Sequence, residues 1–262
     1  MGRVLCIANQ KGGVGKTTTA VNLAATLAAA QKRTLLIDMD PQGSATSGLG
    51  ARDLGERPTT YDIVMGERPI RDVALPTSLE ALQLVPAHRD LVGAEVELVS
   101  ALAREFRLRE ALKSVRDEYD YILIDCPPSL GLLTINGLTA ADGVLIPLQC
   151  EYYAMEGLSA LLDTVTLIRE RLNQSLTVHG IVLTMFDTRN SLSHQVSEEV
   201  RKHFPERVFR TVIPRNVRLS EAPSHGLPIL LYDPTSKGAL AYADLAREMI
   251  ERESMGAEQR LA

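Results

Sequence analysis

The chain has 262 residues, of which 45% are apolar and 4% aromatic, and its formal net charge at pH 7 is −5. This composition predicts a large aliphatic core and excludes a protein that attracts nucleic acid by its overall charge. Three widely spaced cysteines exclude a disulfide framework, and no apolar run approaches the ~20 residues of a bilayer span, so we expect a cytoplasmic protein.

Strand-like and helix-like segments alternate along most of the chain. The apolar runs that predict strands are Val4–Ala8, Thr34–Asp38, Leu82–Pro86, Tyr121–Asp125, Gly143–Leu148, Gly180–Met185 and Val208–Ile213. The helical patterns are Lys16–Ala30, Glu97–Arg116, Gly157–Asn173, Ser191–Phe204 and Ala239–Glu253. Near-continuous apolar strands separated by helices indicate a doubly wound α/β fold, a mostly parallel sheet flanked by helices. We expect one domain over residues 1–253, with a surface loop at 50–60 and a polar, frayed tail at 254–262.

The stretch KGGVGKTTT at residues 11–19 lies between the first strand and the first helix. It differs from the P-loop pattern G-x-x-x-x-G-K-[ST] at one position, because Gln10 stands where the first glycine is expected. Glycines at 12, 13 and 15 let backbone N–H groups approach phosphate oxygens, and the positive end of the following helix points to the same place. The motif predicts that Lys16 contacts the β- and γ-phosphates and that Thr17 ligates Mg²⁺.

Carboxylates follow two of the predicted strands. Asp125 ends the run YILID, where it fits the role of holding Mg²⁺ through a water molecule. Asp38 and Asp40 follow the run LLI, where a carboxylate could orient the attacking water for phosphoryl transfer. Asp38 is also the weaker of two candidates for the metal. The sequence therefore predicts a magnesium-nucleotide site at the carboxyl ends of the strands.

Five segments together resemble the ParA/Soj chromosome-partitioning ATPases, a branch of the deviant-Walker P-loop proteins. The segments are KGGVGKTTTAVNLA, DMDPQGSATSGLG, DCPPSLGLLTINGL, QCEYYAMEGLSALLDTV and VIPRNVRLSEAPSHGLPILLYDPTSKGA. The resemblance covers about Val4 to Ala246. The loop alone also fits MinD-like ATPases and nitrogenase iron proteins, whereas the later segments are more specific to the partitioning branch.

The resemblance implies roles for the matching residues. Lys11 corresponds to the signature lysine, which reaches the phosphates of the partner subunit in a face-to-face ATP dimer, and Gly12 lies where a side chain would obstruct that partner. Asp40 corresponds to a residue needed for hydrolysis. The residues that match the phosphate loop are Gly13, Val14, Gly15, Lys16, Thr17 and Thr18, and those that match positions beside adenine are Pro214 and Asn216. Residues 184–187, TMFD, lack the Asn-Lys pair that reads guanine in related GTPases, so ATP is favoured.

A local basic stretch is the candidate for binding DNA. Residues 201–218 contain six Lys or Arg and one Glu, a balance of +5 in an otherwise acidic chain. No helix-turn-helix signature is evident, so we expect contacts with phosphates rather than with bases. Arg215 could instead serve the nucleotide or the dimer interface. The candidates for phosphate contact are Arg189, Lys202, Arg218 and Lys237.

The resemblance implies an ATP-dependent switch that segregates chromosome or plasmid DNA. ATP drives a homodimer that binds DNA non-specifically in the nucleoid, and a ParB-type centromere-binding partner stimulates the slow hydrolysis that releases it. A MinD-like membrane-positioning ATPase is the alternative, but it needs a basic amphipathic C-terminal helix, and AREMIERESMGAEQRLA lacks a basic face, so we expect no membrane partner. An iron–sulfur reductase needs cysteines that bridge a cluster, and no well-placed partner for Cys126 is evident.

Overall fold

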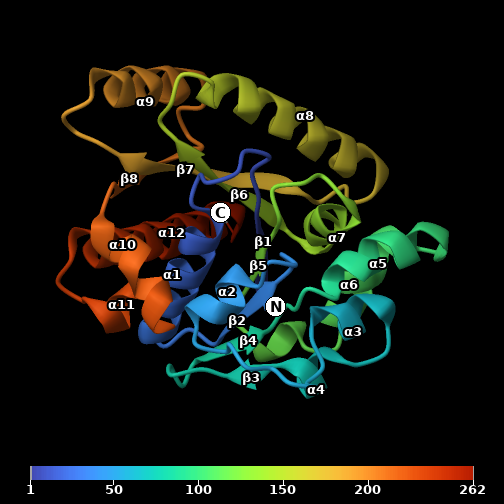
Figure 1. Cartoon of the computed structure of the whole chain (residues 1–262). Coiled ribbons are helices and arrows are strands. Elements are labelled where there is room, and N and C mark those ends of the chain that lie inside the picture. Colours follow the sequence, from blue (N-terminus) through green and yellow to red (C-terminus); the bar gives the residue numbers. More distant parts are fainter. Residues whose placement is uncertain (1, 262) are drawn as a thin grey trace.

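A computed structural model describes residues 2–261, with side chains through Met255. In the described chain, eight strands form one sheet in the order β3-β4-β2-β5-β1-β6-β7-β8 (Figure 1). The strands are β1 (Arg3–Ile7), β2 (Thr34–Asp38), β3 (Leu75–Pro76), β4 (Leu82–Val85), β5 (Tyr121–Asp125), β6 (Gly143–Gln149), β7 (Thr177–Phe186) and β8 (Val208–Pro214). The edge strand β3 is antiparallel to β4, and the other neighbouring pairs are parallel.

Helices cover both faces of this sheet. They are α1 (Lys16–Ala29), α2 (Ser44–Gly48), α3 (Thr60–Met65), α4 (Ile70–Val73), α5 (Leu91–Glu97), α6 (Arg107–Leu112), α7 (Leu132–Ala140), α8 (Ala154–Arg171), α9 (Ser191–His203), α10 (Val217–Glu221), α11 (Ile229–Tyr232) and α12 (Lys237–Leu261). Short 3-10 turns are η1 (Leu98–Ser100), η2 (Arg104–Phe106), η3 (Arg116–Glu118) and η4 (Ala222–His225). Helices α1 and α12 share an apolar core with one face of the sheet, and α3 to α9 share another with the opposite face. Strands β2 and β5 are therefore buried on both sides, which explains their continuous apolar sequences.

Three strand ends meet at one edge of the sheet. Asp125, the last residue of β5, is in register with Ile7 at the end of β1 and with Asp38 at the end of β2. Parallel strands end on the same side of a sheet, so the loop that follows β1 and the carboxylates of β2 and β5 gather there. Such an edge is the usual place for a ligand in an open α/β sheet.

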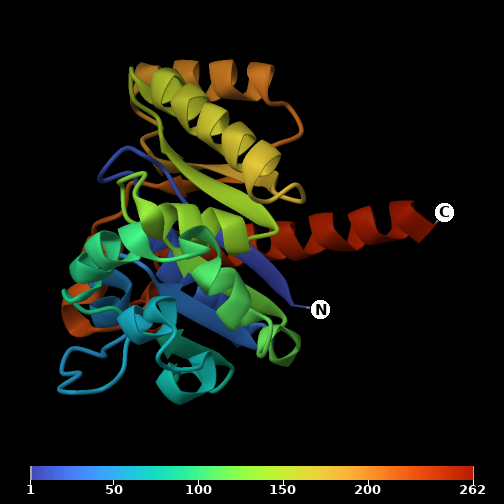
Figure 2. The same cartoon turned by 90° about the vertical axis from the view of Figure 1, so that its right-hand side faces the viewer.

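The fold class expected from the sequence is confirmed, and all seven predicted strands are present with small shifts at their ends. Helix α12 runs to Leu261, past the predicted end at Glu253, and Figure 2 shows its last turns extending beyond the sheet. Through residue 261, none of the helices is long and apolar enough to span a bilayer.

The predicted helix at Glu97–Arg116 is wrong as a single element. The backbone turns at Ala103, whose φ of 52° lies in the left-handed region, and α6 begins only at Arg107. This break allows Leu98 and Leu108, on either side of it, to reach the same apolar core. Burial of both leucines thus outweighs the helical pattern of the sequence.

Two cysteines lie side by side near the carboxyl ends of β1 and β5. The Sγ atoms of Cys6 and Cys126 are 3.2 Å apart, and both residues are buried. Gly137 of α7 faces them, and a Cβ atom at that position would lie 2.7 Å from the Cys126 sulfur. Cys150 is also buried. The three thiols are therefore inside the subunit, which argues against a cluster bridged between subunits.

Candidate nucleotide-binding site

The loop between β1 and α1 has the backbone geometry expected of a phosphate loop. Gly13 and Gly15 have φ angles of 74° and 87°, in the left-handed region that side chains disfavour, and Gly15 caps α1. Gly12 also has open space around it, because a Cβ atom there would have no neighbour within 4 Å, but unlike Gly13 and Gly15 it does not have a positive φ. Contacts within the subunit do not require glycine at this position. The resemblance implies that the partner subunit, rather than this one, restricts position 12 to glycine, and the open space around Gly12 agrees with that implication.

Hydrogen bonds to the neighbouring strands β6 and β7 anchor the loop. The Asn9 amide donates to the carbonyl of Pro147 at 2.7 Å, and its Oδ1 accepts from the backbone N–H of Lys11 at 3.0 Å. The Thr184 hydroxyl donates to the carbonyl of Val14 at 2.8 Å. Sequence reasoning missed Asn9 and Thr184. The available signal for Asn9 in the sequence was its position, since it is a polar residue at the end of the first apolar run.

Lys16 lies beneath the loop at the start of α1. It is buried, and its Nζ donates to the carbonyl of Lys11 at 3.0 Å. Burial lowers the pKa of Lys16, while the nearby charges of Asp125 and Asp40 act in the opposite direction. The structure therefore brings this lysine together with two of the strand-end carboxylates.

Asp125 is a buried carboxylate without a complete set of partners. It is fully buried, and neither of its oxygens accepts a hydrogen bond of normal geometry from a described residue. Burial and the neighbouring Asp38 charge raise the pKa of Asp125 well above its ordinary value, and Thr17 and Lys16, which lie beside it, oppose this shift. A buried carboxylate beside a threonine hydroxyl matches the oxygen ligands that Mg²⁺ takes when phosphates and water complete its coordination.

The oxygens of Asp38 are already occupied. They accept hydrogen bonds from the N–H and hydroxyl of Thr46, at 2.8 and 2.7 Å, and from the N–H of Asp40 at 3.1 Å. Burial raises the pKa of Asp38 to about 6. Asp40 is half-buried and accepts from the N–H of Gln42 at 2.9 Å. Asp38 therefore orders the loop that carries Asp40, and its geometry offers less to a metal than that of Asp125.

A cavity of about 270 Å³ continues from the phosphate loop. Gly15, Thr18, Pro214 and Asn216 are among the residues that line it. Asn216 also caps α10, because its Oδ1 accepts from the N–H of Arg218 at 2.9 Å. The two residues that match adenine positions thus share one cavity with the end of the phosphate loop, although they lie far from it in the sequence.

The surface beside Lys11 is acidic and aromatic. The Lys11 ammonium forms an ion pair with Glu151 of the same subunit. Tyr152 and Tyr153 follow and are 77% and 65% exposed, and Leu130 of the loop after Asp125 is also exposed. Large exposed apolar side chains around a ligand site commonly mark an interface. Sequence reasoning missed Glu151, since its contact with Lys11 spans 140 positions.

The predicted DNA-binding residues lie on several elements near the β8 edge of the sheet, where Figure 1 places α9 and α10. They are Arg189 before α9, Lys202 in α9, Arg218 in α10 and Lys237 at the start of α12. Arg189 pairs with Asp187 at 2.9 Å, and Arg218 pairs with Glu221 and Asp233 at 2.8 and 3.4 Å. Acidic residues outside residues 201–218 therefore offset part of the positive charge of that stretch. Counting charges within the stretch could not show these ion pairs.

Comparisons with known proteins cover almost the whole chain. A family model described as "AAA domain" matches residues 2–178. The chain is 60% identical over 254 residues to the chromosome partitioning protein ParA of Myxococcus xanthus (strain DK1622), an alignment that covers 97% of this chain and 90% of that protein. It is 58% identical over 249 residues to the sporulation initiation inhibitor protein Soj of Bacillus subtilis (strain 168), covering 95% and 98%.

A solved structure of similar fold contains a nucleotide. It is cobyrinic acid a,c-diamide synthase from Mycobacterium smegmatis with bound ADP and magnesium. The TM-score is 0.85 at 36% identity, over 98% of this chain and 97% of that chain.

Proposed function

The chain belongs to the ParA/Soj family of chromosome-partitioning ATPases, and we propose that it is the ATP-dependent switch of a DNA-segregation system. The observation that carries the proposal is the buried Asp125 carboxylate, which lies beside Lys16 and Thr17 and accepts no hydrogen bond of normal geometry from a described residue. A magnesium-bound nucleoside triphosphate would satisfy the carboxylate through water and the lysine through phosphate. When bound, Mg²⁺ would neutralise part of the negative charge of the phosphates.

The remaining residues of the site take separate roles. Asp40 orients the attacking water. Asp40 is itself held in position by the loop that Asp38 orders through its hydrogen bonds. Pro214 and Asn216 contact the adenine in the cavity beside Thr18. The residues that surround the phosphates are Gly12, Gly13, Val14, Gly15, Lys16, Thr17 and Thr18.

ATP drives formation of a homodimer through Lys11, which lies at the loop surface and reaches the γ-phosphate bound by the partner subunit. A cation placed on that phosphate makes dimerisation depend on it. The exposed Tyr152 and Tyr153 support this placement of the interface. The dimer binds DNA phosphates without regard to sequence, and doubling the basic surface raises its affinity. A ParB-type partner stimulates hydrolysis and thereby releases the subunits from the nucleoid.

DNA binding measured with no nucleotide, with ADP and with ATP tests this function. We expect retention on DNA only with ATP and magnesium. Retention that is independent of nucleotide, or absent under all three conditions, would contradict the proposal. Vesicles of anionic phospholipid provide a parallel arm, and ATP-dependent binding to vesicles instead of DNA would favour the MinD-like alternative.

A further inference from the structure

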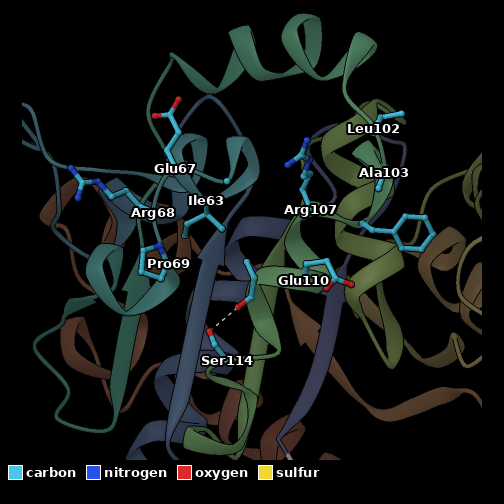
Figure 3. A pocket seen from close by; sticks show the side chains of 12 residues that line it. Ile63, Glu67, Arg68, Pro69, Leu102, Ala103, Arg107, Glu110 and Ser114 are labelled. Carbon is cyan, nitrogen blue, oxygen red and sulfur yellow. Dashed lines mark hydrogen bonds between the residues drawn. The ribbon is translucent and has the colours of Figure 1, made fainter.

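A groove separate from the nucleotide cavity lies between the segment that follows α3 and the segment formed by η2 and α6 (Figure 3). Its volume is about 420 Å³. Ile63 and Pro69 lie on one wall, and Leu102 and Arg107 lie on the other. Phe106 of η2 also lines the groove. No residue lines both this groove and the nucleotide cavity.

Arg107 lines this groove and has no carboxylate partner among the described residues. Its Nε is buried without a hydrogen-bond partner, and no described side chain forms an ion pair with its guanidinium. Gly66 leaves room for it, since a Cβ atom there would lie 3.4 Å from its Nη1. Of the acids that line the groove, Glu110 pairs with Lys113 at 2.7 Å, and Glu67 lies on the opposite wall beyond ion-pair distance. A carboxylate from outside the subunit would pair with the two Nη groups of this guanidinium, which are not buried without partners.

Hydrogen bonds from helix α7 hold the wall that carries Arg107 in place. Asn136 of α7 is fully buried, accepts from the N–H of Leu108 at 3.2 Å and donates to the carbonyl of Arg104 at 2.8 Å. These two bonds fix the backbone on both sides of Arg107. The groove is therefore formed before any ligand arrives, which lowers the entropic cost of binding.

Exposed apolar side chains lead to the rim of the groove. Val92, Val96 and Val99 are 56%, 73% and 59% exposed, and Leu102 at the rim is 90% exposed. Their spacing of three or four residues places them along one strip of α5 and η1. Several large exposed apolar side chains on one segment commonly mark a binding surface.

We propose that this groove binds a segment of a partner protein that presents a glutamate or aspartate beside a large aliphatic residue. The carboxylate accepts paired hydrogen bonds from Arg107, whose planar fork matches carboxylate geometry. The aliphatic side chain packs against the exposed Pro69 and Leu102. Charge complementarity and the apolar walls support this occupant, and neither depends on the roles assigned at the nucleotide site.

Two synthetic peptides test this site on the full chain. The probe is acetyl-Ala-Leu-Glu-Leu-Ala-amide, and its matched control has Gln in place of Glu. Methyl NMR signals of Ile63 and Leu102 report binding. We expect saturable shifts with the Glu peptide and about tenfold weaker binding of the Gln peptide, as for loss of one charge-assisted pair.

Two variants locate the interaction. Arg107→Gln should remove the preference for the Glu peptide, whereas Arg169→Gln, which removes the same charge from an exposed position of α8 outside the groove, should keep it. Leu102→Asp should abolish binding without unfolding, because Leu102 is almost fully exposed. Absent shifts, equal affinity for both peptides, or a preference that survives Arg107→Gln would overturn the proposal. Loss of the ATP dimer in Leu102→Asp, with no peptide binding to the parent, would assign the groove to a second copy instead.

Discussion

The ammonium of Lys11 is ion-paired with the carboxylate of Glu151 within a single subunit, with side chains 39% and 43% exposed. In the proposed dimer the same lysine contacts a phosphate held by the partner. Glu151 and that phosphate therefore compete for one cation, and the ion pair within the subunit opposes dimerisation until ATP is present.

Glu151→Gln should strengthen ATP-dependent dimerisation. An ion pair of this exposure contributes ~0.5–1 kcal/mol, so we expect the half-maximal ATP concentration for dimerisation to fall about two- to fivefold. Light scattering during an ATP titration measures it. Glu156→Gln, an exposed position in α8, is the control and should behave like the parent. Weaker dimerisation in Glu151→Gln would show that Glu151 directs Lys11 toward the partner rather than competing for it.

Lys16→Ala should abolish nucleotide-dependent behaviour. Its ammonium lies beneath the loop, and no neighbouring cation replaces it on the phosphates. The parent should gain ~2.7 kcal/mol of stability when free nucleotide is 100 times its Kd, and the variant should gain none. Thermal unfolding with and without ATP and magnesium measures this difference. The exposed Lys113→Ala serves as a control, and a nucleotide-stabilised Lys16→Ala protein would refute the loop assignment.

Asp40→Ala should separate binding from hydrolysis. Lys11, Lys16 and Thr17 remain, so ATP should still bind and dimerise the chain. Loss of a group that positions the reacting water commonly costs ~10²–10³ in rate, or about 3–4 kcal/mol. Phosphate release and dimer mass, measured on the same sample, report the two properties. An unchanged hydrolysis rate would move the role to another carboxylate, Asp38 being next.

Asp125→Asn should stabilise the nucleotide-free protein. Burial raises the pKa of Asp125, so the ionised carboxylate opposes folding. The contribution of Asp125 to the free energy of unfolding therefore falls as the pH rises through its folded pKa. At pH 8 we expect a Tm increase on the order of 3 °C, corresponding to ~1 kcal/mol, which shrinks toward pH 4. The variant should also lose the extra stabilisation that magnesium gives with ATP. A lower Tm than the parent at pH 8 would show that the carboxylate is satisfied in the free protein.

Arg189→Glu combined with Arg218→Glu should abolish DNA binding and leave the ATP dimer intact. If the parent dimer neutralises about five phosphates, its log–log salt slope is about −4.5, and raising salt from 50 to 200 mM should weaken binding on the order of 10²–10³-fold. Dimer mass by scattering and DNA affinity at two salt concentrations are measured together. Parent-like affinity would place the DNA surface elsewhere, and loss of dimerisation would place one arginine in the subunit interface.

The control for this variant is Arg33→Glu with Arg247→Glu. Both control arginines form surface ion pairs, with Asp120 at 3.0 Å and Asp244 at 2.9 Å, and both lie outside the basic stretch. The change in net charge is the same. Near-normal DNA affinity of this control is expected, and a loss as large as that in the test variant would attribute the effect to overall charge.

The sequence alone predicted those features of the fold and site that depend on residues close together in the chain. The glycines of the phosphate loop and Asp125 at the end of an apolar strand could be located because turns and strand ends have short-range signals. Helix α7 was missed, since its β-branched residues and Gly137 favour helix weakly and its stability comes from burial. The Lys11–Glu151 pair and the unpaired Nε of Arg107 depend on residues distant in the chain, so no local pattern predicts them.

Gly137 shows how a position without chemistry of its own can appear functional in a genetic screen. Any side chain there would meet the sulfur of Cys126, whose neighbour in the chain is Asp125. The strand end that carries the candidate magnesium ligand would have to move. Partition-defective alleles at Gly137 would therefore fall into the same class as alleles of the nucleotide loop, and they should not be interpreted as marking a partner-binding surface on α7.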